Sequence, residues 1–547
     1  MSKTASANED YNNNTNADVP HYLMWFRRDL RICDNTALAA ICERANDNNA
    51  SVSAIFLVTP EQWQTHGTSV AQVDHILRTL PILAHDLQTQ LNITLHVQVC
   101  QNFTNCVDTL SALCAANHIS CVMANHEYEG NEIDRDEQLT AQLAKNDIEF
   151  MRWHDQCILP PQSITTNDSD TMYKVFTPFY KKWRHTLEVS TMQMHEPTAI
   201  NSSNKDKLET SNESTTTIQA IEKLGKEIVD NYQKALRDDF SLQDIDLLQH
   251  IDMDTQLDHA QADYPAGEAA AYERLEAFIA DDINDYDTGR DVPSLHATSQ
   301  LSAYLTIGTI SPRLCYLQAT KALEKLHGND GDTFNNFDNN DINRWISELA
   351  WRDFYRHVLV EKPELVRHKA YKEVTDTKIN WSYDNDDFIA WCTGMTGVPL
   401  VDAAMRCLNA TGFMHNRLRM VTAMFLTKDL LIDWRLGERY FNQQLIDGDF
   451  SSNNGGWQWS ASTGTDSAPY FRIMNPFSQA ETHDTDGEFI KTWLPELKDM
   501  PASILHSEDK MRKALAKGGK FAKTDYPLPI VEHKVARQLA IAEFKKE

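Results

Sequence analysis

The hydrophobic periodicity of the chain changes once, near residue 267, and this change limits the folds that are open to it. Before it, short apolar runs alternate with segments whose apolar residues recur at helical spacing. The runs that we predict to be strands are 22–26, 51–59, 93–99, 119–125 and 148–153. This alternation predicts an α/β fold with a parallel, doubly wound sheet, which binds ligands at the carboxyl ends of its strands. A GxGxxG fingerprint is absent, so no dinucleotide site of the usual kind is expected there.

From Gly267 onward the periodicity is almost wholly helical, which predicts an all-α unit. Between the two parts, residues 196–262 are poor in apolar residues and rich in Ser, Thr, Asn and charge. We interpret them as part of a long linker with a helix at 218–236. The predicted organisation is a disordered polar tail at 1–20, an α/β unit at 21–160, a linker with an insertion at 161–262 and a helical unit at 263–547.

The net charge of −28 argues at first against a nucleic-acid partner, because phosphate contacts need clustered Lys and Arg. The distribution of charge weakens that argument. Residues 406–439 contain six Lys or Arg and only three acids. A locally basic stretch in an acidic chain leaves DNA open as a partner.

The ten cysteines are scattered without a CxxC pair, so we predict neither a metal site nor an iron–sulfur cluster. The polar, Asn-rich first twenty residues do not resemble a secretory signal, and no apolar run is long enough to span a membrane. We therefore expect a cytoplasmic protein with reduced thiols and no membrane association.

Two polar motifs of the helical half are candidate parts of a ligand pocket. DGDFSSNNGGWQW at 447–459 combines carboxylates, amides, glycines and indoles; it fits either a surface loop or a pocket for a flat polar ligand. TSQLSAYLTIG at 298–308 places hydroxyls at a predicted helix start, which fits either an ordinary N-cap or an anion site.

Two further motifs carry charge on predicted helix faces. In WISELAWRDFYRH at 345–357, Glu348 shares a face with two indoles, which is costly for a core acid unless it is paired. MHNRLRM at 414–420 mixes phosphate-binding and apolar side chains, or is simply a solvated face.

These motifs, with WFRRDLRICDN at 25–35, MYKVFTPFYKKW at 172–183 and YPLPIVEHK at 526–534, are similar to the cryptochrome/photolyase family. The similarity is closest to the bacterial folate-type photolyases that split cyclobutane pyrimidine dimers. It runs from about residue 20 to the C-terminus, apart from 198–262. The resemblance implies light-driven electron transfer from reduced FAD to a dimer in UV-damaged DNA, carried out by a monomer.

The resemblance implies a set of FAD-binding positions in the helical unit: Tyr286, Thr298, Ser299, Gln300, Leu301, Ser302, Trp345, Arg419, Asp447, Gly448, Asp449 and Asn453. Gln300 stands where relatives often carry Arg, which puts one phosphate contact in doubt. Asn453 matches the residue that faces the flavin N5 nitrogen. Asp447 and Arg419 resemble an ion pair that flanks the ring.

Catalysis in this family needs the dimer to leave the duplex, and photolyases are an established case of base flipping. The matching DNA-binding positions are Glu348, Trp351, Asn416, Arg417, Met420 and Trp459. The two indoles would hold the flipped dimer, and Glu348 would bind its carbonyl edge. Trp457, Trp434 and Trp381 match a relay that passes electrons from the surface to the flavin, although a structural role remains open.

An antenna site is implied by HEYEGNEIDRD, directly after a predicted strand. Asn131 and Glu132 match the residues that hold methenyltetrahydrofolate, and Arg367 stands where a Lys usually completes the site. A deazaflavin, an empty site or a plain acidic first turn of a helix remain open alternatives.

Three rival functions within the family leave signs in a sequence. A cryptochrome without repair commonly carries a long C-terminal tail, and this chain ends soon after VEHK. A six-four photolyase needs a His pair in the lesion pocket, but His415 is followed by Asn416. The iron–sulfur relatives need a cysteine cluster. Repair of cyclobutane dimers is therefore the favoured prediction.

Overall fold

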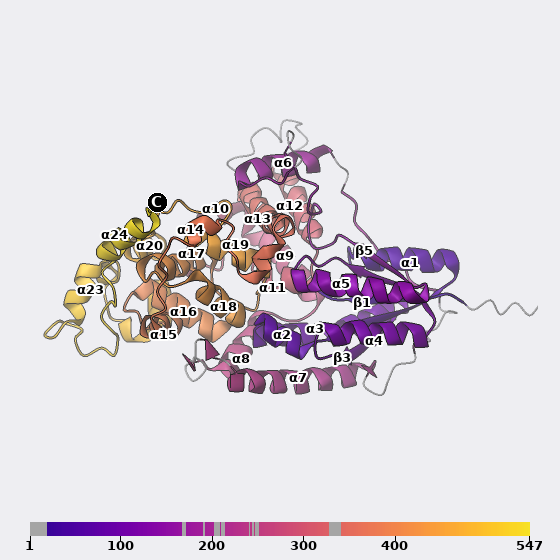
Figure 1. Cartoon of the computed structure of the whole chain (residues 1–547). Helices are drawn as coiled ribbons and strands as arrows, with labels where there is room; N and C mark the ends of the chain where they lie inside the picture. Colours follow the sequence, from indigo (N-terminus) through magenta and orange to yellow (C-terminus); the bar gives the residue numbers. More distant parts are fainter. Residues whose placement is uncertain are drawn as a thin grey trace, which may run out of the picture.

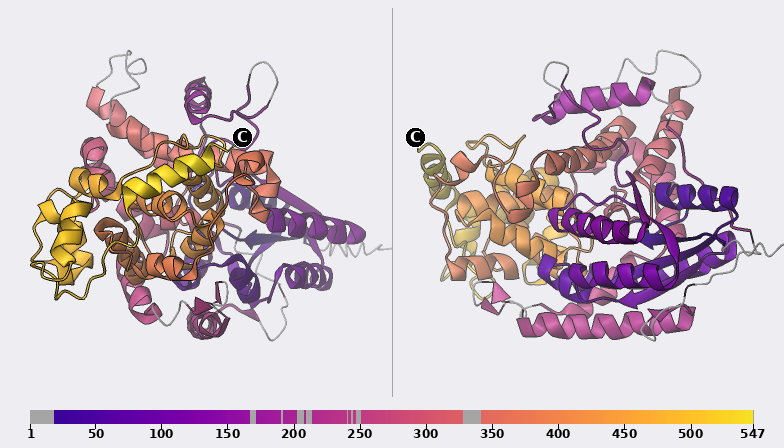
Figure 2. Two further views of the ribbon diagram at one scale, coloured as in Figure 1. Left: turned by 60° about the vertical axis from the view of Figure 1, so that its left-hand side comes forward. Right: turned by 45° about the vertical axis from the view of Figure 1, so that its right-hand side comes forward.

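The computed structural model describes residues 19–166, 171–189, 192–201, 208, 214–239, 241–242, 245–246, 251–327 and 341–546. The predicted disordered tail therefore lies almost entirely outside the described residues. The chain builds an α/β unit, coloured indigo to purple in Figure 1, and a helical unit, coloured pink through orange to yellow. Figure 2 shows that the C-terminal helices lie at the end of the helical unit remote from the sheet.

Five parallel strands form the sheet in the order β5-β4-β1-β2-β3, and a short antiparallel strand, β6, is added at the β3 edge. The strands are β1 (His21–Phe26), β2 (Ser51–Val58), β3 (Thr94–Val99), β4 (Ile119–Asn125), β5 (Glu149–Trp153) and β6 (Ser214–Thr215). β1 and β2 are buried along their whole length, as expected for strands covered on both faces. The predicted doubly wound parallel sheet is confirmed.

Helices cover both faces of the sheet. They are α1 (Thr36–Asn48), α2 (Pro60–His66), α3 (Val70–Asp86), α4 (Phe103–Ala116) and α5 (Gly130–Leu143). Alternate strand residues point to opposite faces. Met24 and Phe26 therefore pack with residues of α1 and α3, whereas Leu23 and Trp25 pack with residues of α4 and α5.

Part of the segment that we interpreted as a linker belongs to the α/β unit. The predicted helix is present as α7 (Ile218–Asp239), and it lies along α3 (Figure 1). Its buried face, including Ile221, Ile228 and Tyr232, joins the main core. β6 extends the sheet at its β3 edge, and α7 packs against α3, so this part of the segment is folded onto the α/β unit. The remaining elements of this region are α6 (Phe176–Val189), β7 (Ser241–Leu242), β8 (Ile245–Asp246) and α8 (Met253–Asp263).

The helical unit confirms the predicted change of periodicity. Its helices are α9 (Glu268–Asp281), α10 (Tyr286–Gly289), α11 (Ser302–Ile307), α12 (Pro312–His327), α13 (Asp341–Glu361), α14 (Glu373–Asp376), α15 (Asn385–Thr393), α16 (Pro399–Thr411), α17 (Asn416–Met424), α18 (Trp434–Gln444), α19 (Phe450–Ala461), α20 (Pro476–His483), α21 (Glu488–Trp493), α22 (Ala502–Leu505), α23 (Glu508–Leu515) and α24 (His533–Phe544). α13 and α19 pack against each other, and each carries three of the candidate site residues.

Four charged side chains join the two units in a buried cluster. Asp155 accepts hydrogen bonds from Arg31 at 2.6 Å and from Arg313 of α12 at 2.9 Å. Arg313 also donates to Asp34 at 2.9 Å. Asp34 and Asp155 are fully buried. Burial alone would raise the pKa of Asp155, but Arg31 and Arg313 outweigh it and hold that pKa well below its usual value.

Close backbone contact supports the same junction. Gly308, at the end of α11, has φ +77, and a Cβ there would lie 2.1 Å from the carbonyl oxygen of Arg28. Leu30 N donates to Ile307 O beside it at 3.3 Å. Only glycine fits this position, because the approach and the backbone conformation both exclude a side chain.

We expect Asp155→Asn to destabilise the protein strongly, because it leaves two buried guanidinium groups short of one negative charge. Breaking a buried ion pair costs about 3–5 kcal/mol, so the midpoint of thermal unfolding should fall by several degrees. Glu149→Gln is the matched control: it breaks the exposed pair with Arg44, worth about 0–1 kcal/mol. Equal shifts in the two variants would contradict the structural role of the cluster.

Candidate functional site

An acidic loop between α18 and α19 holds two of the predicted cofactor residues in ion pairs. Arg419 donates to both carboxylate oxygens of Asp447, at 3.0 and 2.8 Å. The guanidinium of Arg419 also lies over the ring of Phe413, 5.5 Å from its centroid. Between the two acids, the carbonyl oxygen of Gly448 accepts a hydrogen bond from Gln72 of α3 at 2.8 Å. The loop is thereby fastened to both units.

Asp449 has two roles that keep it ionised. It caps α19 by accepting a hydrogen bond from Ser452 N at 2.9 Å, and it pairs with Arg356 of α13 at 2.6 Å. Burial would raise the pKa of Asp449, but Arg356 and Arg352 outweigh it and lower the pKa to about 2. The carboxylate is therefore charged at any physiological pH.

The first turns of α19 present an amide to a cavity. The Asn453 side chain donates to the carbonyl oxygen of Glu438 at 2.9 Å and lines the cavity described below. The two glycines that follow, Gly455 and Gly456, have different roles. A Cβ at Gly455 would lie 2.2 Å from the ring of Tyr355, whereas one at Gly456 would meet nothing within 4 Å. Gly455 allows close packing of α13 on α19, and Gly456 faces open space.

The predicted phosphate-binding loop divides into buried and accessible residues. Leu301, Tyr286 and Trp345 are core residues, and Trp345 packs on Phe278 with ring centroids 5.2 Å apart. Thr298, Ser299 and Ser302, by contrast, are half-buried. The apolar residues therefore anchor the loop, and its binding of phosphates stays a prediction.

Gln300 accepts a hydrogen bond from an arginine, Arg274, that was not predicted from the sequence. Arg274 of α9 donates to Gln300 Oε1 at 2.6 Å and lies over the rings of Tyr264 and Tyr304. A guanidinium therefore lies beside the position where relatives often carry Arg. No periodic signal could have shown this, because Arg274 sits on an amphipathic helix like many solvated arginines.

The predicted lesion-binding residues lie on α13, α17 and α19. Trp351 stacks face to face on Phe176, with centroids 3.7 Å apart and planes 7° apart, so one face of its indole is covered. Trp351 also contacts Tyr355, with centroids 5.5 Å apart, and Tyr355 and Trp459 line one small pocket. Tyr355 therefore connects the two predicted indoles.

Alternating charges run beside these indoles. Arg290 donates to Glu348 at 2.6 Å, and Arg417 donates to Asp291 at 2.5 and 3.2 Å. Arg290 and Asp291 are 3.9 Å apart, which closes a four-member chain. Burial would raise the pKa of Asp291, but Arg417 and Arg290 outweigh it and lower that pKa. Arg290 is a second residue that the sequence analysis missed.

The two remaining predicted contacts lie on α17. Asn416, the first residue of that helix, is exposed, and Met420 is half-buried one turn later. His415 precedes them as the N-cap, with its ring nitrogen accepting from Arg417 N at 3.2 Å. Burial lowers the pKa of His415 to about 4, so its ring is neutral at physiological pH.

The three predicted relay tryptophans have unequal surroundings. Trp457 and Trp434 are buried, and Trp381 is half-buried. Trp457 packs against Gly437 of α18, where a Cβ would lie 2.1 Å from its ring. Trp434 is the first residue of the same helix, one turn before Gly437. Trp434 and Trp381 donate to the same acid, Asp376.

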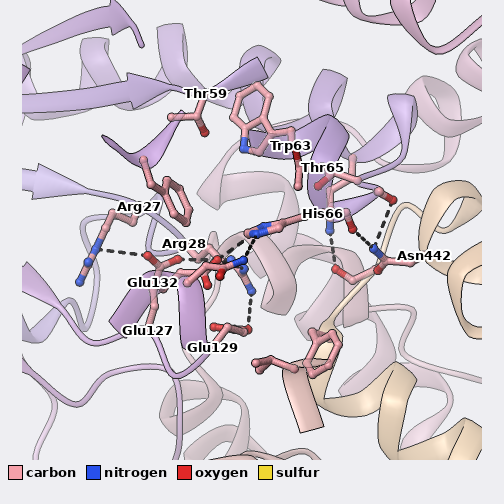
Figure 3. A pocket seen from close by; sticks show the side chains of 18 of the residues that line it. Arg27, Arg28, Thr59, Trp63, Thr65, His66, Glu127, Glu129, Glu132 and Asn442 are labelled. Carbon is pink, nitrogen blue, oxygen red and sulfur yellow. Dashed lines mark hydrogen bonds and ion pairs between the residues drawn. The ribbon is translucent and has the colours of Figure 1, made fainter. Parts of the chain in front are cut away.

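A cavity of about 600 Å³ opens at the carboxyl ends of the strands and reaches the helical unit (Figure 3). Its lining runs from Trp25 and Trp63 of the α/β unit to Asn453 of α19. Cavities of this size, with apolar walls and a few polar groups, are typical of cofactor sites. It lies where ligands bind in doubly wound folds.

The predicted antenna residues lie at the wall of this cavity. Asn131 contacts His66 Nε2 at 2.9 Å. Glu132 Oε1 lies 3.4 Å from Arg28 and 3.7 Å from His66 (Figure 3). Glu132 is buried and its second carboxylate oxygen has no partner among the described residues. Burial, with Glu129 next, raises the pKa of Glu132 to about 8.

Two neighbours of this group differ from expectation. His66 was missed, although it follows the second predicted strand at the sheet edge where ligands bind; burial lowers its pKa to about 4. Arg367 is exposed, and its neighbours Val366 and His368 line the cavity instead.

Comparisons with known proteins agree with this geometry. The family model for the FAD binding domain of DNA photolyase matches residues 345–546, and the DNA photolyase model matches residues 22–199. The deoxyribodipyrimidine photo-lyase of Escherichia coli is 39% identical over 525 residues, which are 96% of this chain and 98% of that protein. The chain belongs to the DNA photolyase family.

Solved structures of photolyases and a cryptochrome share the fold. A Synechocystis cryptochrome superposes with a TM-score of 0.76 at 26% identity, covering 96% of this chain and 99% of that one. A Sulfolobus tokodaii photolyase with two FAD molecules gives 0.72 at 27% identity, with coverage of 96% and 99%. In the present chain, the helical unit is accordingly the FAD-binding domain.

The residues present fit such a cofactor. Of the predicted positions, Gly448 and Asn453 line the cavity, and Arg419 pairs with Asp447 directly before Gly448. Thr298, Ser299 and Ser302 are half-buried, and the lining of this cavity does not include them. The cation at Gln300 suits an anionic group.

We expect Glu132→Gln to remove a pH-dependent loss of stability. The carboxyl pKa is near 4.5 in the unfolded chain and about 8 in the folded one, so the folded state holds the extra proton between these values. Stability then falls as pH rises from about 4.5 to about 8. The gain in melting temperature from Glu132→Gln should be larger at pH 8 than at pH 5. Glu137→Gln, exposed on the same helix, should show no such difference; equal gains at both pH values would contradict the assignment.

Proposed function

We propose that this photolyase is a deoxyribodipyrimidine photo-lyase, which uses light to split cyclobutane pyrimidine dimers in UV-damaged DNA. The observation that carries the proposal is the meeting of Trp351 and Trp459 at Tyr355, beside an ion-paired Glu348. Two indoles and a carboxylate are what a pocket for two joined, flipped bases requires. The near full-length similarity to photo-lyases of this name supports the same substrate.

Within this pocket each side chain has a distinct task. Trp351 has one face covered by Phe176, so a base can stack on the other, and Trp459 supplies the second apolar wall. Glu348 accepts hydrogen bonds from the dimer while Arg290 holds it in place. The exposed Asn416 and the half-buried Met420 contact the dimer from α17.

Phosphate binding falls to Arg417, although that residue is paired with Asp291. A phosphate must share the guanidinium with Asp291, and the forked geometry of Arg allows both contacts. Arg290, at the centre of the charge chain, lies close enough to assist. The net charge of −28 is an average over the whole chain, so phosphate contacts at a few arginines remain compatible with it.

The cofactor residues orient and balance the flavin. Bound FAD, when reduced and excited by light, supplies the electron that opens the dimer. Asn453 has its amide oxygen available to accept an N–H hydrogen bond, because its amide nitrogen already donates to Glu438. Arg419 supplies a positive charge that balances an anionic ring while Asp447 holds it in place. Trp457, Trp434 and Trp381 carry electrons inward from the surface.

For the antenna we favour methenyltetrahydrofolate. The unpartnered oxygen of Glu132 suits the paired N–H donors of a pterin, and Asn131 and His66 lie beside it. Arg367 is exposed near the cavity mouth, where it can meet the carboxylates of a folate. A deazaflavin, or a second FAD such as the Sulfolobus photolyase contains, is the alternative occupant.

We further propose that the protein is a cytoplasmic monomer. Among the described residues, no helix combines the length and the apolar character that crossing a bilayer requires. The ten cysteines, all within the described residues, form no disulfide with one another, which suits a reducing compartment.

We expect Glu348→Ala to lower the repair yield per absorbed photon about threefold or more at saturating dimer-containing DNA. A hydrogen bond to a charged group contributes about 1.5–3 kcal/mol, and this one stabilises the dimer as it accepts the electron. FAD content should be unchanged. Glu361→Ala, exposed at the end of the same helix, is the control. An unaltered yield would remove Glu348 from the pocket. If the unmodified protein itself repairs nothing, a cryptochrome-like signalling role replaces the proposal.

We expect added methenyltetrahydrofolate to give the protein a new near-ultraviolet absorbance band. Glu132→Ala should abolish the band, because it removes the buried acceptor, while Glu137→Ala should retain it. Absorbance spectra after gel filtration measure the bound folate. Absence of the band in the unmodified protein would exclude folate and leave the repair proposal intact.

A further inference from the structure

Asp376 receives the indole N–H groups of two tryptophans on one oxygen. Trp434 Nε1 donates to Asp376 Oδ1 at 3.1 Å, and Trp381 Nε1 donates to the same atom at 3.2 Å. Asp376 is buried, 8% exposed, at the end of the short helix α14. One carboxylate therefore serves the outer two positions of the proposed relay.

The inner tryptophan has no comparable partner. Trp457 is buried, and its Nε1 lacks a hydrogen-bond acceptor among the described residues. Its neighbours are apolar: the rings of Phe441 and Trp391 lie 4.9 and 6.0 Å away, and Gly437 packs against its edge. A positive charge left on Trp457 would thus be poorly stabilised.

A cation distinguishes the two outer tryptophans from each other. Arg435 donates to the second oxygen of Asp376 at 2.6 Å, and its guanidinium lies over Trp434, 4.6 Å from the ring centroid. A positive charge on Trp434 would be repelled by Arg435 and attracted by Asp376. On Trp381, which the structure does not place under that guanidinium, the attraction by Asp376 is less opposed. Trp381 is also half-buried, so water can solvate its charge.

We infer that Asp376 directs the oxidising charge outward from Trp457 to Trp381, and this inference rests on the proposed relay. In each event Trp457 gives one electron to the photoexcited oxidised flavin, Trp434 refills Trp457, and Trp381 refills Trp434. The proton stays on Trp381 Nε1, in its hydrogen bond to Asp376. A soluble thiolate finally returns one electron to Trp381 and becomes a thiyl radical. Asp376 is a positioning residue that stabilises the oxidised indole long enough for that last step.

The size of the effect follows from general electrostatics. An opposite charge within about 4–6 Å shifts the equilibrium between charged and neutral forms of a group by 1–3 pKa units, which is about ten- to a thousandfold. Removing the charge of Asp376 should lower the share of events that reach Trp381 by at least about tenfold, because the inner tryptophan recovers its electron first.

The test compares photoreduction of the oxidised FAD holoenzyme, in the presence of a thiol, across four variants. Asp376→Asn keeps an acceptor but removes the charge, and its yield should fall at least about tenfold. Asp376→Glu keeps the charge and should retain yield to within about threefold. Asp384→Asn is the matched control: it is exposed, caps α15, and Asn caps equally well, so yield should stay within about twofold. Trp381→Phe should lose photoreduction.

A second readout needs no flavin chemistry. In protein labelled with ¹⁵N-tryptophan, Asp376→Asn should move the indole N–H resonances of Trp381 and Trp434. The resonance of Trp391, which donates to Thr422 O at 3.1 Å, should stay in place. Melting temperature and FAD content show whether each variant is folded. If Asp376→Asn does not fold, Asp376→Glu alone decides: a yield that falls as far as that of Trp381→Phe overturns the inference.

The outcomes distinguish failure of the proposed role of Asp376 from failure of the proposed tryptophan relay. Normal photoreduction in Trp381→Phe would overturn the relay itself, and the inference with it. Loss in Trp381→Phe with unchanged yield in Asp376→Asn would leave the relay standing and overturn the role of Asp376. Loss in both, with retention in Asp376→Glu and Asp384→Asn, supports the inference.

Discussion

The buried ion cluster of Arg31, Asp34, Asp155 and Arg313 is the contact on which the rest of the molecule depends. It connects loops of the α/β unit to the start of α12. The four charges are buried only because the two units meet there. With Gly308 pressed against the backbone of Arg28, it sets how the two units meet. The large cavity lies along that junction, with its lining drawn from both units. The shape of the cofactor and antenna sites therefore depends on the contact between the two units, which the ion cluster and the contact at Gly308 stabilise.

Functional carboxylates in this photolyase are mostly neutralised by a named arginine. Asp447 pairs with Arg419 and Glu348 pairs with Arg290, so an arginine holds each acid in position. Glu132 is the exception, since one of its oxygens has no partner and its pKa rises to about 8. The contrast has a physical reason: a fully paired acid is stable alone, whereas an unsatisfied buried acid is costly until a ligand supplies donors. A buried polar atom without a hydrogen-bond partner therefore indicates a ligand site more strongly than an ion-paired carboxylate does.

Much of the fold followed from periodicity, and the exceptions are instructive. The parallel sheet and the helical second half were predictable, because short apolar runs alternate with helical segments in the first half and helical spacing alone continues in the second. The segment around α7 was not, because its strand β6 has two residues and its helix shows one apolar face without showing that α3 covers it. Among site residues, motif similarity located Asn453 and Glu348, but neither Arg274 nor Arg290 belonged to any recognisable pattern.

The sequence by itself determined which segments are helix or strand, where caps and glycines stand, and to which family the motifs belong. Those features depend on residues close together along the chain. Only the tertiary structure decided the partners: the guanidinium at Gln300, the second unit of the cavity, and the carboxylate shared by two indoles. Asp376 precedes Trp381 by five residues and Trp434 by 58, so no local pattern could join the three. Contacts between segments that are far apart in the sequence produce no regular spacing of residues, because packing of the whole chain brings those segments together.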